Sequence, residues 1–265
     1  MNRHVRTAAF VLVAALPAAS MATANAAIRV HFEGAVERPG AATLEDGARL
    51  ADAALAAAPL PRAYALGGAW LRPALRHEQT RTRAGLAFEL GTLRERAAAR
   101  GEPALAAQLE AMQRWVLALP VTGRQPGALL DPRPLEADPP RNRPLAAGDR
   151  LRYPVRPEWV RIVGAVAAQC TLAHVPLQDA HTYLAHCPQL PTADPDRIHV
   201  VQPDGQVFER GIALWNRDAP LALAPGATIY VPLRPALLQR SGVDAGFNRE
   251  LAGFLATQVL PAEAP

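Results

Sequence analysis

Lysine is absent from this sequence, in which all 28 basic residues are arginine. The chain is rich in alanine and proline, and together these features indicate the base composition of the genome rather than a nucleic-acid footprint. Nucleic-acid binding would require basic side chains gathered on one face of the fold. We therefore expect no nucleic-acid partner.

Long hydrophobic runs are also scarce. The apolar run AAFVLVAALPAA near the N-terminus has about a dozen residues, whereas a membrane-spanning helix needs about 20. It follows Arg3 and Arg6 and is followed by Ala24-Asn25-Ala26, a pattern typical of a secretory signal peptide. We expect cleavage after about Ala26 and an exported mature chain with no transmembrane segment. Loss of the two arginines lowers the formal net charge from +4 to +2.

The chain has only two cysteines, Cys170 and Cys187. In an oxidising compartment two cysteines so close in sequence favour a disulfide, worth about 3 kcal/mol; the alternative is two buried thiols. His174, His181 and His186 lie nearby, but His181 and His186 are five positions apart and do not share a helix face. We expect neither a metal site nor a cofactor.

Recognisable catalytic motifs are missing as well. The sequence has no Gly-x-Ser-x-Gly, no Walker loop and no dinucleotide fingerprint. Hydrolysis of a glycan would require two carboxylates on either side of the scissile bond. The acidic residues form no recognisable pair of this kind: Glu33, Glu45, Asp46, Asp131 and Asp138. The sequence therefore favours a non-catalytic protein over an enzyme.

Two segments of the chain have nearly the same ending. GDRLRYPVRP spans residues 148–157, and GATIYVPLRP spans residues 226–235. Upstream, the tripeptide Gly-Ala-Val follows an alternating apolar run at Gly34 and again at Gly164. Such self-similarity indicates an internal duplication, which must be identified before the fold is assigned.

Each copy contains the elements of a small α+β unit. A strand with period-two alternation, as between Ile28 and Phe32, precedes a helix that we expect to open with Leu-x-Asp-Ala, at Leu50 and at Leu177. Further strands follow. One helix packed on one sheet face fits a β-grasp-like fold. We expect a first module over residues 27–157 and a second module over residues 158–235.

The first copy is longer than the second. Gly34 and Gly164 are 130 positions apart, whereas Gly148 and Gly226 are 78 apart, so the first copy holds 52 additional residues. Leucines recur at helical spacing across this surplus. We predict a helical hairpin, inserted into the first module at about residues 79–120.

The C-terminal segment, residues 236–265, contains an amphipathic pattern. Phe247, Leu251 and Phe254 fall on one face, and polar residues fall on the other. The pattern predicts a helix of about 15 residues, which is too short to cross a bilayer. We expect it to pack against the protein or a partner, with peripheral contact to a membrane surface as the alternative.

Three segments taken in order resemble the capsule biosynthesis GfcC family across nearly the whole mature chain. They are ALPVTGRQPGALLDPRPLEADPPRNRPLAAGDRLRYPVRP, VVQPDGQVFERGIALWN and FNRELAGFLATQVLP. The segment VHFEGAVERPG also looks like the ligand-binding β-grasp module of polysaccharide export proteins. The resemblance implies a periplasmic protein of capsule or exopolysaccharide production, with polysaccharide or export machinery as partner. It implies a pathway rather than a reaction.

The residues that follow the predicted insertion are the best candidates for a site. Gly123 permits a tight turn, and Arg124 should lie where the hairpin returns to the first sheet. A guanidinium can bind a carboxylate or phosphate, and the resemblance implies a functional arginine here. The alternative is an arginine that hydrogen-bonds carbonyls at the helix exit. Asp131 would pair with Arg124 and orient it. The candidate ligand-binding residues are Thr122, Arg124, Asp131 and Asn142.

Four tryptophans are candidates for stacking on sugar rings, although a lone tryptophan is more often part of a core. They are Trp70, Trp115, Trp159 and Trp215, and we expect Trp215 to be a core anchor. Three hypotheses follow for the function. The leading one is a glycan-binding accessory of polysaccharide export. The others are a polysaccharide-modifying enzyme with its site near Arg124, and a structural partner of the exporter that uses the terminal helix.

Overall fold

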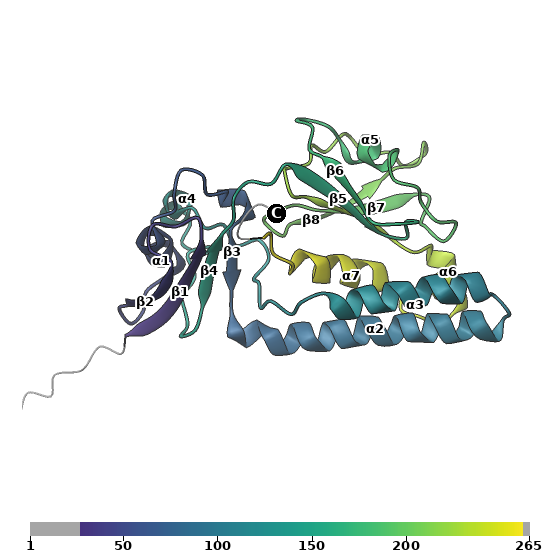
Figure 1. Ribbon diagram of the computed structural model, residues 1–265, viewed down its shortest axis with the longest axis horizontal. Coiled ribbons are helices and arrows are strands. Elements are labelled where there is room, and N and C mark those ends of the chain that lie inside the picture. Colours follow the sequence, from purple (N-terminus) through teal and green to yellow (C-terminus); the bar gives the residue numbers. More distant parts are fainter. Residues whose placement is uncertain (1–26, 262–265) are drawn as a thin grey trace, which may run out of the picture.

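The computed structural model describes residues 27–261, so the predicted signal peptide lies outside the described residues. Figure 1 shows two sheets side by side, with helices packed against each. The two sheets, the helices and the helical insertion confirm the predicted α+β class. In chain order the elements are β1 (Ile28–Gly34), β2 (Gly40–Leu44), α1 (Leu50–Ala57), β3 (Ala69–Leu71), α2 (Arg76–Ala99), α3 (Pro103–Ala118), α4 (Pro132–Ala137), β4 (Arg150–Tyr153), β5 (Trp159–Gly164), β6 (Cys170–Ala173), α5 (Ala180–Leu184), β7 (Arg197–Val201), β8 (Val207–Gly211), β9 (Thr228–Val231), α6 (Pro235–Arg240) and α7 (Phe247–Ala256), with short 3-10 turns at Ala65–Gly67 and Pro73–Leu75.

The first sheet has the strand order β2-β1-β4-β3, with β1 and β4 parallel and the outer pairs antiparallel. Because successive residues of a strand point to opposite faces, Val30 and Phe32 enter the core while Arg29 and His31 face solvent. Helix α1 supplies the other side of that core. The first module is therefore a sheet covered on one face.

The second sheet repeats this arrangement and adds one strand, in the order β6-β5-β9-β7-β8. Strands β5 and β9 form its parallel central pair. Strands β7 and β8 form a hairpin whose turn contains Pro203-Asp204-Gly205 and is closed by a 2.8 Å hydrogen bond from Gly205 N to Gln202 O. Apart from β8, the strands thus follow the same order in both sheets.

The Gly-Ala-Val tripeptides occupy equivalent places in the two sheets. Gly34 has φ +82° and Gly164 has φ +102°, conformations that favour glycine. A Cβ on Gly34 would meet Tyr153 O at 2.1 Å, and one on Gly164 would meet Val231 O at 2.3 Å. The next residue in each case, an alanine, donates its N–H to that same carbonyl. The duplicated tripeptide therefore marks the point in each sheet where the two central strands approach each other closely.

The proposed match between the two short helices is out of register by three residues. Leu50 opens α1 and is buried, whereas Leu177 lies before α5, with φ +62° and a side chain that is 87% exposed. Helix α5 begins at Ala180 and is capped by Asp179, whose Oδ1 accepts from Thr182 N at 3.0 Å. The shared letters Leu-x-Asp-Ala therefore serve different structural roles.

The insertion occupies the position of a hairpin turn. In the second module Val201 and Val207 pair across the five residues 202–206. In the first module the corresponding bridge joins Leu71 to Arg124, so residues 72–123 replace that turn. They contain α2 and α3, and α2 begins at Arg76, slightly earlier than predicted. An isolated bridge at Arg124 stands where the second module has the whole of β8.

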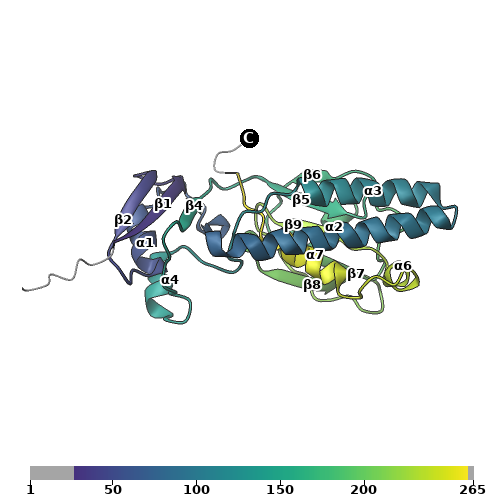
Figure 2. The same cartoon turned by 90° about the horizontal axis from the view of Figure 1, so that it is seen from below.

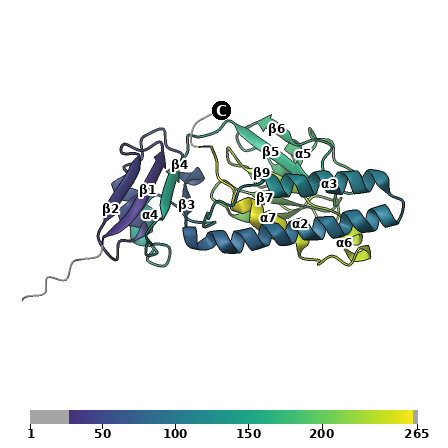
Figure 3. The same cartoon turned by 60° about the horizontal axis from the view of Figure 1, so that its bottom comes forward.

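Although the hairpin is inserted into the first module, it packs on the second. Figure 1 shows α2, α3 and α7 on one side of the second sheet and α5 on the other, and Figures 2 and 3 show α2 and α3 side by side along that sheet. Leu86, Leu90, Leu109 and Val116 of the hairpin are fully buried in the core of the second module. The second sheet is therefore covered on both faces.

The C-terminal segment forms two short helices, α6 and α7, and α7 has 10 residues rather than about 15. Its apolar face is buried, with Phe247 and Leu251 at 0% exposure and Phe254 at 2%. This face packs inside the chain, between α2 and the second sheet, and is therefore not available for a membrane surface. Among the described residues no helix is long and apolar enough to span a membrane.

Candidate functional site

Arg124 lies at the edge of the first sheet, where the insertion returns to it. Arg72 N donates to Gly123 O at 2.8 Å, and Gln125 N donates to Trp70 O at 2.8 Å. Gly123 has φ +79°, and a Cβ there would meet Arg72 O at 2.5 Å. The glycine therefore lets the chain approach β3 closely and turn the next side chain toward the second module.

The guanidinium of Arg124 is buried among backbone carbonyls. It is 3% exposed. Its Nη1 donates to Gln258 O at 2.6 Å and to Ala256 O at 3.4 Å, and its Nη2 donates to Gly68 O at 3.4 Å and to Pro203 O. These acceptors come from the end of α7, the turn before β3 and the β7–β8 turn. Arg124 thus ties the two modules together.

Arg124 has no ion-pair partner among the described residues. Burial lowers its pKa to about 10, an effect that the charge of Asp204 opposes, so it remains charged at neutral pH. Its Nε is buried without a hydrogen-bond partner. This geometry corresponds to the alternative in which the arginine satisfies carbonyls. Direct binding of a ligand by Arg124 stays a prediction.

Thr122 and Gln79 complete the same junction. Thr122 Oγ1 donates to Thr257 O at 2.7 Å and accepts from Arg124 N at 2.9 Å. Gln79 is buried on α2, where its Oε1 accepts from Gly123 N at 2.8 Å and its Nε2 donates to Arg124 O at 2.9 Å. The structure brings Thr122 and Arg124 together at this junction. Gln79 was not predicted, because nothing in its local sequence marks it.

Asp131 and Asn142 serve other parts of the first module. Asp131 caps α4, accepting from Arg133 N at 3.2 Å, and it makes no ion pair with Arg124; the expected pair is therefore wrong. Asn142 Oδ1 accepts from Ala51 N in the first turn of α1 at 2.9 Å. Neither residue is among those lining the spaces around Arg124.

An open hollow of about 350 Å³ lies beside Arg124, between α2 and α7. We call this space the hairpin hollow. Its walls combine apolar and polar groups, and two carboxylates face it from different helices. The lining residues that matter below are Glu78, Thr82, Gln125, Glu250, Gly253 and Phe254. The hollow therefore opens beside the inserted hairpin.

Trp70 is a core residue of the first module. It is 1% exposed, its Nε1 donates to Asp149 Oδ2 at 2.9 Å, and the Arg72 guanidinium lies 4.4 Å from the ring centroid. Burial raises the pKa of Asp149, although hydrogen bonds from Ala146 and Trp70 and the charge of Arg72 oppose this. Trp70 is therefore unavailable for stacking on a sugar.

Trp215 is exposed, and the expectation that it anchors the core is wrong. Its side chain is 73% exposed, and that of the neighbouring Leu214 is 90% exposed. Trp215 Nε1 donates to Asp196 Oδ1 at 3.2 Å, which orients the indole. Trp115 and Trp159 are half-buried. Of the four tryptophans, Trp215 presents the most surface to solvent.

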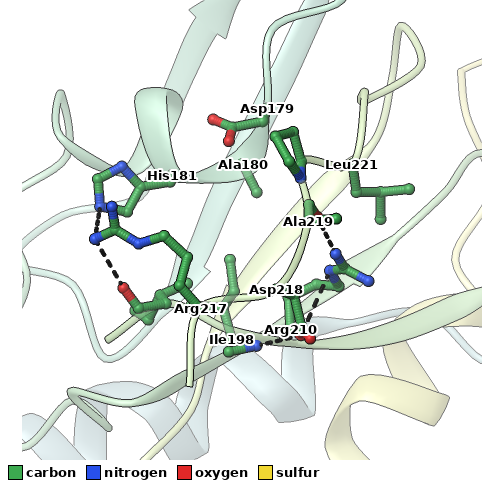
Figure 4. A pocket seen from close by; sticks show the side chains of 12 residues that line it. Asp179, Ala180, His181, Ile198, Arg210, Arg217, Asp218, Ala219 and Leu221 are labelled. Atoms are coloured by element: carbon green, nitrogen blue, oxygen red, sulfur yellow. Dashed lines mark hydrogen bonds and ion pairs between the residues drawn. The ribbon is translucent and has the colours of Figure 1, made fainter. Parts of the chain in front are cut away.

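A second pocket, of about 70 Å³, lies where α5 meets the loop after β8. We call it the arginine pocket, and Figure 4 shows it at close range. Arg217 and His181 point toward each other, with Nη2 3.4 Å from Nε2. Arg210 instead approaches Asp218, with Nε 3.8 Å from Oδ2. Sequence reasoning missed this pocket because its residues come from three separate segments.

The predicted disulfide is confirmed: Cys170 and Cys187 are joined, with an S–S distance of 2.02 Å. The described residues contain no group of three or more possible metal ligands. Glu33, one of the acidic residues considered above, is paired with Arg150 and Arg152 across β1 and β4.

Comparison with known proteins supports the resemblance found in the sequence. Residues 169–260 match the family profile described as capsule biosynthesis GfcC C-terminal. Over 128 residues the chain is 32% identical to a protein named "Uncharacterized protein YjbG" from Escherichia coli (strain K12), an alignment that covers 48% of this chain and 51% of that protein. The chain thus spans about half the length of the curated relative it matches. These matches confirm the predicted family resemblance, most directly for the second module.

Proposed function

Because the second module carries the profile of the capsule biosynthesis GfcC family, we propose that this protein is a periplasmic accessory of capsule or exopolysaccharide production. In this proposal it binds a segment of the polysaccharide in the hairpin hollow. The polysaccharide, or the machinery that exports it, is then its partner. The proposal rests on the hollow itself, which is the observation that carries it.

The chemistry and size of the hairpin hollow support saccharide binding. Its volume of about 350 Å³ falls in the range of about 300 to 1,000 Å³ that is usual for small-ligand sites. Thr82 and Gln125 supply hydroxyl and amide groups that both donate and accept hydrogen bonds, as sugar hydroxyls require. Leu75, which is half-buried, supplies apolar surface for the ring. A short stretch of glycan fits this combination.

In this proposal Arg124 acts as a positioning residue. Its guanidinium holds the end of α7 and the β7–β8 turn through three carbonyls and the turn before β3 through a fourth, and Thr122 adds a contact to Thr257. These contacts fix the wall of the hairpin hollow that α7 provides. Arg124→Gln is therefore expected to weaken glycan binding and to lower the melting temperature together.

Gly253 offers a direct test of the hairpin hollow. It lines the hollow from α7, and a Cβ there would meet nothing within 4 Å. Gly253→Trp should fill the hollow without a clash. Gly85→Trp is the matched control, because Gly85 is also an exposed helical glycine with open space around it but lies outside the hollow.

The measurement is calorimetric titration of the full mature chain with oligosaccharides prepared from the capsule of the source strain. We expect Gly253→Trp to bind at least about tenfold more weakly than wild type, and Gly85→Trp to bind like wild type. Equal affinity of all three proteins would overturn the assignment to the hairpin hollow.

One observation favours a second candidate, a polysaccharide-modifying enzyme. Glu78 and Glu250 face the hairpin hollow from α2 and α7, and a pair of carboxylates is what glycoside hydrolysis uses. Incubation of the protein with the same polysaccharide, followed by sizing of the products, separates the two candidates. Chain shortening that Glu78→Gln and Glu250→Gln abolish would replace the binding proposal by the enzymatic one.

A further inference from the structure

The loop that carries Trp215 is held in place by polar contacts rather than by a core. Asn216 Oδ1 accepts from Ala213 N, and Asn216 Nδ2 donates to Asp196 O, each at 3.0 Å. A Cβ on Gly211 would meet Asn216 O at 2.0 Å, so only glycine allows the loop to close so tightly. The loop is thus built to hold a shape while its two largest apolar side chains, Leu214 and Trp215, remain in solvent.

Arg217 is the available cation of the arginine pocket. Its Nη2 approaches Ile212 O at 3.3 Å and His181 Nε2 at 3.4 Å, both longer than a typical N–H···O bond. Within the part of the chain that the structure describes, no carboxylate lies within 4 Å of it. Since a guanidinium can only donate, it presents unused donors to the pocket.

One oxygen of each of the two carboxylates in the pocket is already engaged. Asp179 Oδ1 accepts from Thr182 N and Thr182 Oγ1, each at 3.0 Å. Asp218 Oδ2 accepts from Gly211 N at 2.7 Å and lies 3.8 Å from Arg210 Nε. Neither oxygen is directed to Arg217, so an anion that enters the pocket does not displace an existing ion pair of Arg217.

The size of the pocket limits what can enter. Its volume of about 70 Å³ compares with about 350 Å³ for the hairpin hollow. A carboxylate or phosphate group fits, and a sugar ring does not. The ring of an acidic sugar would have to remain outside the pocket, whose lining includes Gly211, Ile212 and Arg217 of the loop that carries Trp215.

We propose that the arginine pocket binds the carboxylate of an acidic sugar residue, with Arg217 as its anion ligand and the exposed indole of Trp215 as a stacking surface for the ring. A guanidinium pairs with a carboxylate through two parallel hydrogen bonds. The flat apolar face of a pyranose packs on an aromatic ring, as Trp215 allows. The choice of a saccharide rests on the proposed function, whereas the anion site is argued from the pocket alone.

The test uses defined probes with the full mature chain. Trigalacturonate carries the carboxylate, the corresponding neutral galactose trisaccharide lacks it, and inorganic phosphate reports an anion site with no preference for sugars. We expect wild type to bind trigalacturonate at least about tenfold more tightly than the neutral trisaccharide, and phosphate to compete only weakly. Equal binding of the two trisaccharides, or complete displacement by equimolar phosphate, would overturn the proposal.

Variants separate the parts of the site. Arg217→Gln and Trp215→Ala should each weaken trigalacturonate binding about tenfold, and only Trp215→Ala should weaken what binding the neutral trisaccharide has. Both positions are exposed, so the melting temperature should stay unchanged. Arg114→Gln, an exposed arginine of α3 with no hydrogen-bond or ion-pair partner among the described residues, is the matched control.

The Gly253→Trp variant distinguishes this proposal from the proposed function. If capsule oligosaccharides bind wild type and Arg217→Gln equally while Gly253→Trp loses them, the hairpin hollow stands and the arginine pocket is refuted. If trigalacturonate needs Arg217 but no variant alters binding of the capsule material, the arginine pocket stands and the hairpin hollow is refuted. Absence of binding to any probe refutes both.

Discussion

The two modules share one backbone frame but differ in the outer face of the sheet. Where the first module has Glu33 on β1 and Arg152 on β4, paired at 2.8 Å, the second has Val163 on β5 and Tyr230 on β9. Tyr230 is 0% exposed, and its hydroxyl donates to Asn248 Oδ1 of α7 at 3.1 Å. The same strand pattern thus supports an open charged face in one copy and a covered face in the other.

The difference shows which features of the duplicated backbone both modules keep and which side chains differ between them. Backbone pairing between the central strands depends on Gly34 and Gly164 in the same way. The side chains that point away from the module helix are set by what lies over them, which is solvent in the first module and α7 with the hairpin in the second. Variants at matched positions of the two modules can therefore distinguish the contribution of the shared backbone pairing from that of the helices that cover the second sheet.

The largest loss of unfolding free energy is expected at the glycines that the two modules share. Gly34→Ala and Gly164→Ala each add a Cβ against a carbonyl at positive φ, which should cost about 4 kcal/mol of unfolding free energy. Gly47→Ala is the control, because Gly47 has φ +79° with nothing within 4 Å and should cost about 1 kcal/mol. Urea denaturation measures all three. Similar costs at Gly47 and Gly34 would show that the close approach is not what requires glycine.

The disulfide is a feature of the second module only. Replacing Cys170 and Cys187 together by alanine should cost about 3 kcal/mol, because the link closes a short loop in the unfolded chain. Hydrogen exchange should rise in β5, β6 and α5 before it rises in the first sheet. Equal acceleration in both sheets would mean that the modules unfold as a single unit.

Two buried tyrosines compare the contacts of the central strands. Tyr230→Phe removes a bond to α7, whereas Tyr153→Phe removes a 3.1 Å bond to Leu130 O within the first module. Each should cost about 1 kcal/mol in urea denaturation. Protease sensitivity of α7 should increase only for Tyr230→Phe. An increase in both variants would argue against the hydrogen bond from Tyr230 of β9 as the contact that holds α7 over the sheet.

The smallest effect concerns His199, which pairs with Tyr230 across β7 and β9 and corresponds to Ala69 in the first module. Burial lowers the pKa of His199, although Glu209 and Asp194 oppose this. The unfolded state therefore binds the proton more readily, so this residue's contribution to stability is complete above its unfolded pKa of about 6.5 and decreases as the pH falls below it. His199→Gln should flatten the dependence of unfolding free energy on pH from about 7 downward. An unchanged slope in urea titrations across that range would contradict the assignment.

The sequence predicted the features that local patterns encode. The repeated endings, the alternation from Ile28 to Phe32 and the helical spacing in the insertion yielded both modules and the hairpin. The pairing of Cys170 with Cys187 followed from their number and the expected compartment. Each of these depends on residues that are close in sequence or on a comparison of the chain with itself.

What the sequence did not predict depends on contacts between distant segments. The carbonyls around Arg124 come from residues up to 134 positions away, so nothing near Arg124 distinguishes a ligand clamp from a tie between modules. The periodicity of α2 showed an apolar face but not the sheet that it covers. The apolar residues around Trp215 predict a core position, because they do not reveal that the loop closes tightly at Gly211 and leaves Trp215 exposed. One signal of the covered sheet is present in the sequence: β5 and β9 are more continuously apolar than β1 and β4, which indicates a sheet covered on both faces.

The helical hairpin is inserted in the first module and covers the sheet of the second, so neither copy is independent of the other. A fragment that starts after Pro157 would lose the helices that shield its own sheet and would expose leucine-rich surface prone to aggregation. The two copies are therefore not interchangeable, and recombination could not transfer either one alone into a new protein. Because the boundary between the two repeats is not a boundary between independently folding units, selection must act on both modules together.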